Sequence, residues 1–309
     1  MKSDTRSFYE STVARAVERI LDQLDDALDL GGLARSAGLS PLHFNRIFRG
    51  MIGETPLELH RRLRMERAAH QLLHGDAPIT RIAFDAGYET HESFTRAFGE
   101  RYALSPSAFR RRASELRSGC AGPPQIALPA RSGLHFGAAR ASLAIGPSSS
   151  KGELVMQVDI KQMSALRLAA VRHVGPYHRI SEAFARLGEI AGPAGIIRPP
   201  STAMLGLYHD DPESTPPEQL RADAALTLSE DLPLPAGLTE IRIPAGRYAV
   251  TTHLGPYAGL GDAWARFMGT WLPASGHRVG EGPSFEIYRN TPADTPPDEL
   301  RTEMYLPIA

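Results

Sequence analysis

The stretch Ile79–Arg112, ITRIAFDAGYETHESFTRAFGERYALSPSAFRRR, decides the fold of the N-terminal part of the chain. It predicts a short helix, a turn at Gly87 and a second helix over residues 89–100. The second helix places Phe94 and Phe98 on one face and polar side chains on the other. A helix with a buried aromatic face and a polar outer face suits the major groove of DNA. The pattern therefore predicts a helix-turn-helix.

A similar unit lies about 50 residues earlier in the chain. There Ser40 is placed to cap a helix over Leu42–Arg49, with Pro41 at its first position. Helical spacing also predicts a helix over residues 8–29 and a long amphipathic helix after Pro56 that separates the two units. Either unit alone fits a helical hairpin of any all-α domain. Two in tandem, with a basic excess, favour DNA binding.

Charge is distributed unevenly along the 309 residues, a length that favours two domains. Gly31–Arg117 holds 14 Arg against 9 Asp and Glu, whereas Lys151–Ala309 holds 14 Lys and Arg against 19 Asp and Glu. An anionic partner is therefore expected for the first part only. One cysteine, Cys120, and the lack of any long apolar run predict a cytoplasmic protein without disulfide or membrane span.

Residues 118–152 change in character, because they are rich in Gly, Pro, Ser and Ala and show no sustained period. We interpret them as a linker, in which Ile126, Leu128, Leu134 and Phe136 could dock on a neighbour. The predicted domains on either side are residues 8–117 and 153–309.

An internal repeat marks the C-terminal domain. RLAAVRHVGPY at Arg167–Tyr177 matches RYAVTTHLGPY at Arg247–Tyr257, an offset of 80 residues. The same offset, without a gap, aligns three further pairs: residues 183–186 with 263–266, 207–208 with 287–288, and 215–221 with 295–301. This predicts a duplication of a unit made of a strand, a Gly-Pro turn, a helix and two strands, over residues 155–232 and 235–309.

The fold class follows from the two halves. It is multidomain, with an all-α tandem helix-turn-helix domain followed by an α+β domain of two pseudo-twofold βαββ modules.

Residues 13–112 resemble the DNA-binding domain of AraC/XylS-type transcriptional regulators. The residues that carry the resemblance include Leu33-Ala34, Ser40, Phe44, Arg46, Phe48, Gly53, Pro56, Arg64, Ile82-Ala83, Gly87-Tyr88, Phe94, Arg96-Ala97-Phe98, Ser105-Pro106 and Phe109-Arg110. The resemblance implies two recognition helices, Ser40–Arg49 and Thr90–Glu100, that enter successive major-groove segments.

The expected contacts of these helices with DNA fall into two groups. The base contacts, offered by exposed helix faces, are expected from Leu42, Asn45, Arg46, His91, Glu92, Thr95 and Arg96. The phosphate contacts, which position without specifying, are expected from Arg49, Arg61, Arg81 and Arg101. A solvated surface role is the alternative for any single arginine.

In the C-terminal domain the informative positions are those where the repeats differ. Gly206 in the first copy becomes Glu286 in the second. Period-two alternation places Glu286 and Tyr288 on one face of a strand, and Glu303 and Tyr305 on one face of another. A carboxylate walled by aromatic rings would bind a cationic or polar aromatic ligand. The alternative is that both glutamates face solvent, and the repeated Tyr residues could simply pack at turns.

Residues 155–309 resemble the GyrI-like effector-binding domain, on the basis of HxGPY, FEIY and ELRTEMYLP. The resemblance implies two βαββ modules with a ligand cleft on their pseudo-twofold axis and a glutamate in that cleft. The candidate ligand contacts are Glu286, Glu303, Tyr288, Tyr305, Tyr177, Tyr257, Tyr208 and Trp264. The combination of both domains resembles the Rob type of regulator.

The expected function is therefore sequence-specific transcriptional regulation, with a small, aromatic or cationic effector bound by the C-terminal domain. Promoter DNA and the effector are the expected partners, with RNA polymerase as a further candidate. No catalytic residue or cofactor is expected, because the sequence shows no Ser-His-Asp arrangement, metal set or phosphate-cradling Gly loop. No metal is expected at His173 and His253, because they lack a third ligand at metal spacing. The alternatives are a GyrI-like hydrolase of reactive xenobiotics fused to a DNA-binding domain, and a C-terminal domain that only docks other proteins.

Overall fold

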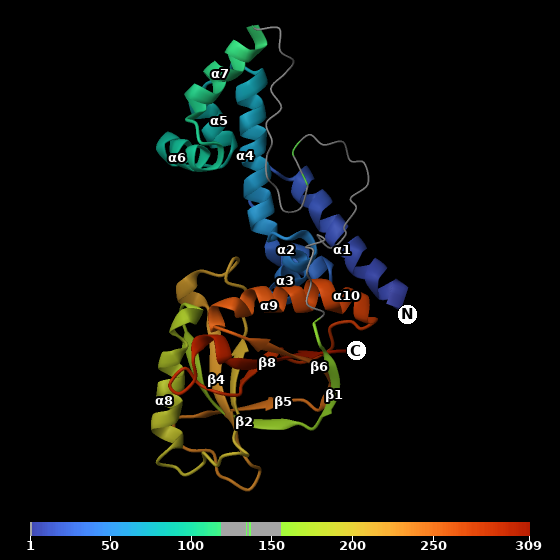
Figure 1. Ribbon diagram of the computed structural model, residues 1–309, viewed down its shortest axis with the longest axis vertical. Helices are drawn as coiled ribbons and strands as arrows, with labels where there is room; N and C mark the ends of the chain where they lie inside the picture. Colours follow the sequence, from blue (N-terminus) through green and yellow to red (C-terminus); the bar gives the residue numbers. More distant parts are fainter. Residues whose placement is uncertain (1, 119–133, 135, 137–155) are drawn as a thin grey trace. The chain divides into compact units, whose positions relative to one another are not determined.

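The computed structural model describes residues 2–118, 134, 136 and 156–309 (Figure 1). The chain divides into two compact units. The first consists of Met1–Ser11, Gly31–Met51 and Ser149–Ala309, and the second of Thr12–Leu30 and Ile52–Ser148. The first predicted recognition helix thus packs in one unit with the C-terminal domain. Most of the linker predicted at 118–152 lies outside the described residues.

The described residues before 119 form helices that are joined by short turns and loops. They are α1 (Lys2–Asp22), α2 (Leu30–Ser36), α3 (Pro41–Ile52), α4 (Pro56–His74), α5 (Ile79–Asp85), α6 (His91–Tyr102) and α7 (Pro106–Ser118). The Ser40 hydroxyl accepts a hydrogen bond from the His43 backbone N–H at 3.2 Å, so the predicted N-cap of α3 is confirmed. None of the helices described is long and apolar enough to cross a membrane.

The second unit is built around the aromatic face of α6. Phe94 and Phe98 are fully buried and pack with Ile82, Ala83 and Phe109 from the neighbouring helices. The helix begins two residues later than predicted, because Thr90 takes the capping position and accepts from the Ser93 N–H at 3.1 Å. The predicted turn at Gly87 is confirmed by its φ of +85°. These local contacts form the helix-turn-helix that the sequence predicts.

Buried charge also organises the second unit. Arg62 on α4 is buried and forms ion pairs with Glu54 at 2.6 Å and with Glu66 at 2.7 Å. Its guanidinium also donates to the Leu134 carbonyl, and the Phe136 N–H donates to Glu66. Of the four residues expected to dock, Leu134 and Phe136 therefore contact α4 through their backbones, and Ile126 and Leu128 lie outside the described residues.

The C-terminal domain contains an eight-stranded antiparallel sheet in the order β1-β6-β8-β7-β3-β4-β2-β5. The strands are β1 (Asp159–Met163), β2 (Leu166–Val174), β3 (Met204–Tyr208), β4 (Arg221–Thr227), β5 (Thr239–Ile243), β6 (Gly246–Leu254), β7 (Phe285–Tyr288) and β8 (Arg301–Pro307). The helices are α8 (Ser181–Ala191), α9 (Leu260–Arg266) and α10 (Leu272–Ser275), with a π-helical turn η4 (Phe267–Trp271) between the last two. Short 3-10 turns η1 (Tyr177–Arg179) and η3 (Tyr257–Gly259) precede α8 and α9.

The strands of the two halves correspond at the offset of 80 residues found in the sequence. Each half also has a first strand that the predicted βαββ unit lacks, namely β1 and β5. Strand β1 pairs with β6 of the second half, and β5 pairs with β2 of the first half. Each half is therefore ββαββ, and its first strand extends the other half. The pseudo-twofold axis stays a prediction.

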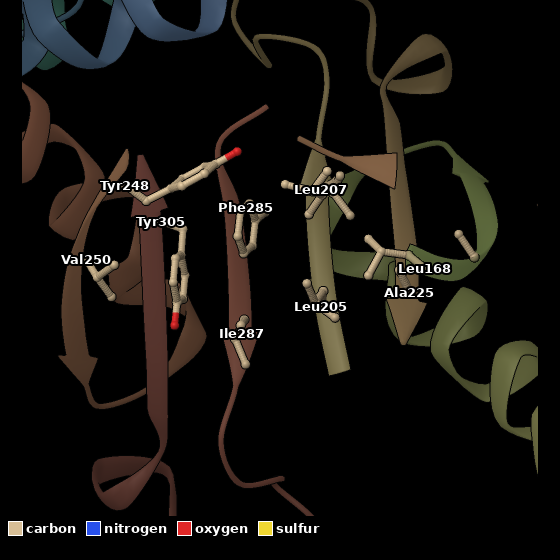
Figure 2. Packing of buried hydrophobic residues seen from close by; sticks show 11 residues of the cluster. Leu168, Leu205, Leu207, Ala225, Tyr248, Val250, Phe285, Ile287 and Tyr305 are labelled. Carbon is tan, nitrogen blue, oxygen red and sulfur yellow. The ribbon is translucent and has the colours of Figure 1, made fainter. Parts of the chain in front are cut away.

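The two faces of the sheet have different neighbours. One face carries a hydrophobic cluster that includes Phe285, Ile287 and Tyr305, with the Phe285 and Tyr305 rings stacked at 4.7 Å (Figure 2). On the opposite face, α8 packs on β2 and β4 through Leu187 and Leu226. The side chains of Glu286 and Tyr288 alternate with Phe285 and Ile287, so they lie on the face that carries the helices.

Candidate functional site

Glu286 lies at the centre of the sheet, where β7 of the second half pairs with β3 of the first. Its partner across the strands is Gly206, the same residue that aligns with it in the repeat. Glu286 is 3% exposed, so the alternative of a solvent-facing carboxylate is wrong for this residue. A buried carboxylate requires hydrogen-bond donors to offset its lost hydration.

Two aromatic side chains donate to this carboxylate. The Trp264 indole N–H donates to Oε1 of Glu286 at 2.7 Å, and the Tyr288 hydroxyl donates to Oε2 at 2.9 Å. The Tyr288 and Tyr208 hydroxyls are 3.0 Å apart. Burial raises the pKa of Glu286, while the bond from Trp264 and the charge of Arg46 oppose that rise.

Further rings surround these hydroxyls. The Tyr177 ring meets Tyr208 edge-on with centroids 4.9 Å apart, and the Phe184 and Tyr257 rings lie 5.6 and 5.3 Å from Tyr288. We name the set the Glu286 cluster. It consists of Glu286, Tyr288, Tyr208, Tyr177, Tyr257, Phe184 and Trp264.

Gly206 gives the two hydroxyls their space. A Cβ atom at this position would lie 2.5 Å from the Tyr288 hydroxyl oxygen and 3.2 Å from Cε2 of Tyr208. The difference between the repeats therefore has a structural reason. One copy supplies the carboxylate, and the other supplies the gap into which the tyrosine beside that carboxylate fits.

The Arg46 side chain of α3 adds a cation to the cluster. Its Cζ atom lies 4.2 Å from the centroid of the Trp264 ring, and the charge of Glu286 acts on it. Burial lowers the pKa of Arg46 to about 10, so the guanidinium is charged at neutral pH. The cluster in this structure thus surrounds a flat cation that is stacked on indole and close to a carboxylate.

Glu303 and Tyr305, also predicted as ligand contacts, lie on the other face of the sheet. The register pairs Ile287 with Glu303 and Phe285 with Tyr305, so both lie on the face that carries the hydrophobic cluster. Figure 2 shows Tyr305 in that cluster. Glu303 accepts from Arg289 at 2.7 Å and from the Tyr305 hydroxyl at 2.6 Å. Although burial raises the pKa of Glu303, these partners bring it below the ordinary value.

The first repeat has an equivalent of this ion pair. Asp223, which aligns with Glu303, accepts from Arg172 and from His209, both at 2.6 Å. The expectation that Glu303 joins Glu286 is therefore not met, because Glu303 holds a structural position that both halves fill with a paired acid.

The recognition helices differ in exposure. On α6, His91, Glu92 and Arg96 are exposed and Thr95 is partly buried. On α3, Leu42 and Asn45 are buried, so the prediction that they face solvent is wrong. The reason for Asn45 is a hydrogen bond from its amide to Asp211 at 2.7 Å.

The arginines predicted to contact phosphate also vary. Arg61 and Arg81 are exposed. Arg49 pairs with Asp262 at 2.6 Å, and Arg101 lies 3.5 Å from Glu66. In the described part of the chain, no group of three or more His, Cys, Asp or Glu is arranged to hold a metal ion.

Sequence reasoning missed Phe184 and Asp211. Phe184 aligns with Trp264 at the offset of 80, so the repeat itself held the signal. Asp211 is 3% exposed, and no motif marks it.

Comparisons with known proteins identify both halves. Residues 156–309 match the GyrI-like small molecule binding domain, and residues 33–112 match a helix-turn-helix domain. A DNA gyrase inhibitor of Yersinia enterocolitica is 35% identical over 140 residues, which cover 44% of this chain and 87% of that protein. The probable transcriptional regulator YgiV of Escherichia coli is 32% identical over 106 residues, covering 34% of this chain and 66% of that protein. The EcmrR protein in a cryo-EM complex with DNA has a TM-score of 0.45 and 18% identity, covering 51% of this chain and 59% of that chain.

Proposed function

This chain belongs to the GyrI-like family and carries an AraC-type helix-turn-helix domain before its small molecule binding domain, and we propose that the Glu286 cluster is its effector site. It is a DNA-binding transcriptional regulator. The proposed effector is a flat aromatic cation.

The buried carboxylate of Glu286 is the observation that carries this proposal. A single buried charge is costly unless a partner of opposite sign is close. The rings around it add attraction for a cation, worth about 2 kcal/mol or more for a desolvated cation–π contact. The arrangement of Arg46 over Trp264 indicates the geometry that such a ligand would take.

On the DNA side, we propose that α3 and α6 are the two recognition helices. Arg46 and Arg96 are the side chains that would fork onto guanine, while Arg61 and Arg81 would contact phosphates. Leu42, Asn45, His91, Glu92 and Thr95 remain candidate base contacts, and a contact with RNA polymerase remains a prediction.

We propose binding rather than turnover for the Glu286 cluster. Both carboxylate oxygens of Glu286 already accept a hydrogen bond, from Trp264 and from Tyr288. Both bonds favour the ionised form of the carboxylate, which is the form that attracts a cation. Chromatography of the ligand after incubation with the protein tests this, because a hydrolase would convert it and a sensor would return it unchanged.

Benzamidine and benzamide are suitable probes of the site. Both are flat and of similar size, but only benzamidine carries a charge. Isothermal titration calorimetry of the full chain should show that benzamidine binds at least tenfold more tightly than benzamide. Glu286→Gln keeps an acceptor for the Trp264 N–H and removes the charge, so it should abolish that preference.

Glu303→Gln is the matched control, because Glu303 lies on the other face of the sheet. It should leave both affinities unchanged. Equal affinities for the two probes, or equal losses in the two variants, would contradict the Glu286 cluster as the cation site.

A further inference from the structure

Helix α3 is anchored to the C-terminal domain by four side chains on successive turns. The Asn45 amide donates to Asp211 at 2.7 Å, and Arg49 pairs with Asp262 at 2.6 Å. The other two side chains, His43 and Arg46, both meet Ser284, which directly precedes β7. Its hydroxyl is 3.2 Å from Nε2 of His43 and 3.4 Å from the Arg46 guanidinium.

The backbones also approach closely. A Cβ atom at Gly50 of α3 would overlap the carbonyl oxygen of Ala265, and a Cβ atom at Gly269 would overlap the backbone of Gly50. Only glycine fits at both positions, so the contact depends on these two residues. A contact with matched glycines and several polar bonds is a specific docking surface.

The docked helix places the Arg46 guanidinium over Trp264 and near Glu286. These are the two side chains that the proposed function assigns to the cationic group of the effector. One carboxylate and one indole face cannot hold two cations at once, because the second would be repelled by the first.

We propose that Arg46 occupies the cation site of the effector domain in place of the ligand, so that effector binding and docking of α3 exclude each other. This inference rests on the proposed function and adds the regulation of the same site. While α3 is docked, Asn45 and Arg46 face protein and cannot read bases. A ligand cation that displaces Arg46 releases the helix for the major groove, and the effector class is therefore a guanidinium- or amidinium-like cation on a flat ring.

Removal of the internal cation tests this directly. Arg46→Met replaces the charged guanidinium with a long, uncharged side chain. It should tighten benzamidine binding to the full chain at least tenfold. Arg186→Met is the matched control, because Arg186 is an exposed arginine of α8 that lies 4.0 Å from Glu189 and takes no part in the docking of α3. It should change benzamidine affinity less than twofold.

A second variant tests the docking from the other side of the contact. Asp211→Ala removes the acceptor of Asn45 and leaves α3 itself unaltered. It should raise the affinity of the full chain both for benzamidine and for a DNA duplex selected by the protein from a random-sequence pool.

The outcomes separate the two proposals. Equal benzamidine affinity in the wild type, Arg46→Met and Asp211→Ala would overturn the exclusion and leave the effector site intact. No benzamidine binding in any of the three would overturn the effector site and the exclusion together.

Discussion

Gly206→Ala tests whether the gap opposite Glu286 shapes the cluster. The added Cβ would lie 2.5 Å from the Tyr288 hydroxyl oxygen, which is closer than two such atoms can approach. The Tyr288 ring packs against the Phe184 and Tyr257 rings, which restrict its movement. Its hydroxyl must move, and the bonds to Glu286 and Tyr208 must stretch or break.

The size of the effect follows from these contacts. Overpacking of a filled site costs about 1–3 kcal/mol. In a Tyr288→Phe background the clashing oxygen is gone, and the nearest remaining neighbours are Cζ of residue 288 and Cε2 of Tyr208, both at 3.2 Å. The cost of Gly206→Ala should therefore fall by at least about 1 kcal/mol in that background.

Urea unfolding followed by tryptophan fluorescence measures this, since both tryptophans, Trp264 and Trp271, lie in the C-terminal domain. The four proteins of the cycle are the wild type, each single variant and the double variant. If Gly206→Ala costs the same in both backgrounds, the argument that Gly206 makes room for the tyrosine hydroxyl is refuted.

Further predictions concern the other parts of the molecule. Phe98→Ala should destabilise the second unit by about 3–5 kcal/mol, measured by thermal unfolding with circular dichroism, and a loss below 1 kcal/mol would contradict its place in the core. Arg96→Ala should cost about 1–3 kcal/mol on a selected duplex and relax its sequence preference, whereas Arg81→Ala should weaken all duplexes alike; the reverse pattern would show that the helix register is wrong. Benzamidine affinity should fall as pH drops through the raised pKa of Glu286, at higher pH than an ordinary glutamate near 4.3 would give, because the ionised carboxylate binds and protonation removes its charge. Arg46, Tyr288 and His253 are the charged or titratable neighbours that act against that rise. An unchanged affinity down to pH 4 would refute the role of the carboxylate.

Local patterns predicted the second helix-turn-helix well. Helix periodicity predicts the burial of Phe94 and Phe98, and the need for a positive φ predicts the turn at Gly87. Both rules act over a few neighbouring residues. The repeat likewise predicted three of the four strands in each half of the C-terminal domain, and comparison of its copies singled out Glu286. These features depend on short-range rules or on a copy within the same chain.

Long-range contacts account for what the sequence did not predict. Alternation along one strand places Glu303 and Tyr305 together, but only the register of β7 against β8 decides that they face away from Glu286. The burial of Asn45 depends on Asp211, which is 166 residues away in the chain. No pattern within α3 carries that information.

The most direct measurement of the central claim is the affinity of the full chain for its selected DNA duplex with and without saturating benzamidine. If the effector site and α3 compete as proposed, benzamidine should tighten DNA binding. The DNA should then tighten benzamidine binding by the same factor, because coupling between two binding sites is reciprocal. The same DNA affinity in both conditions, with benzamidine bound, would contradict the account.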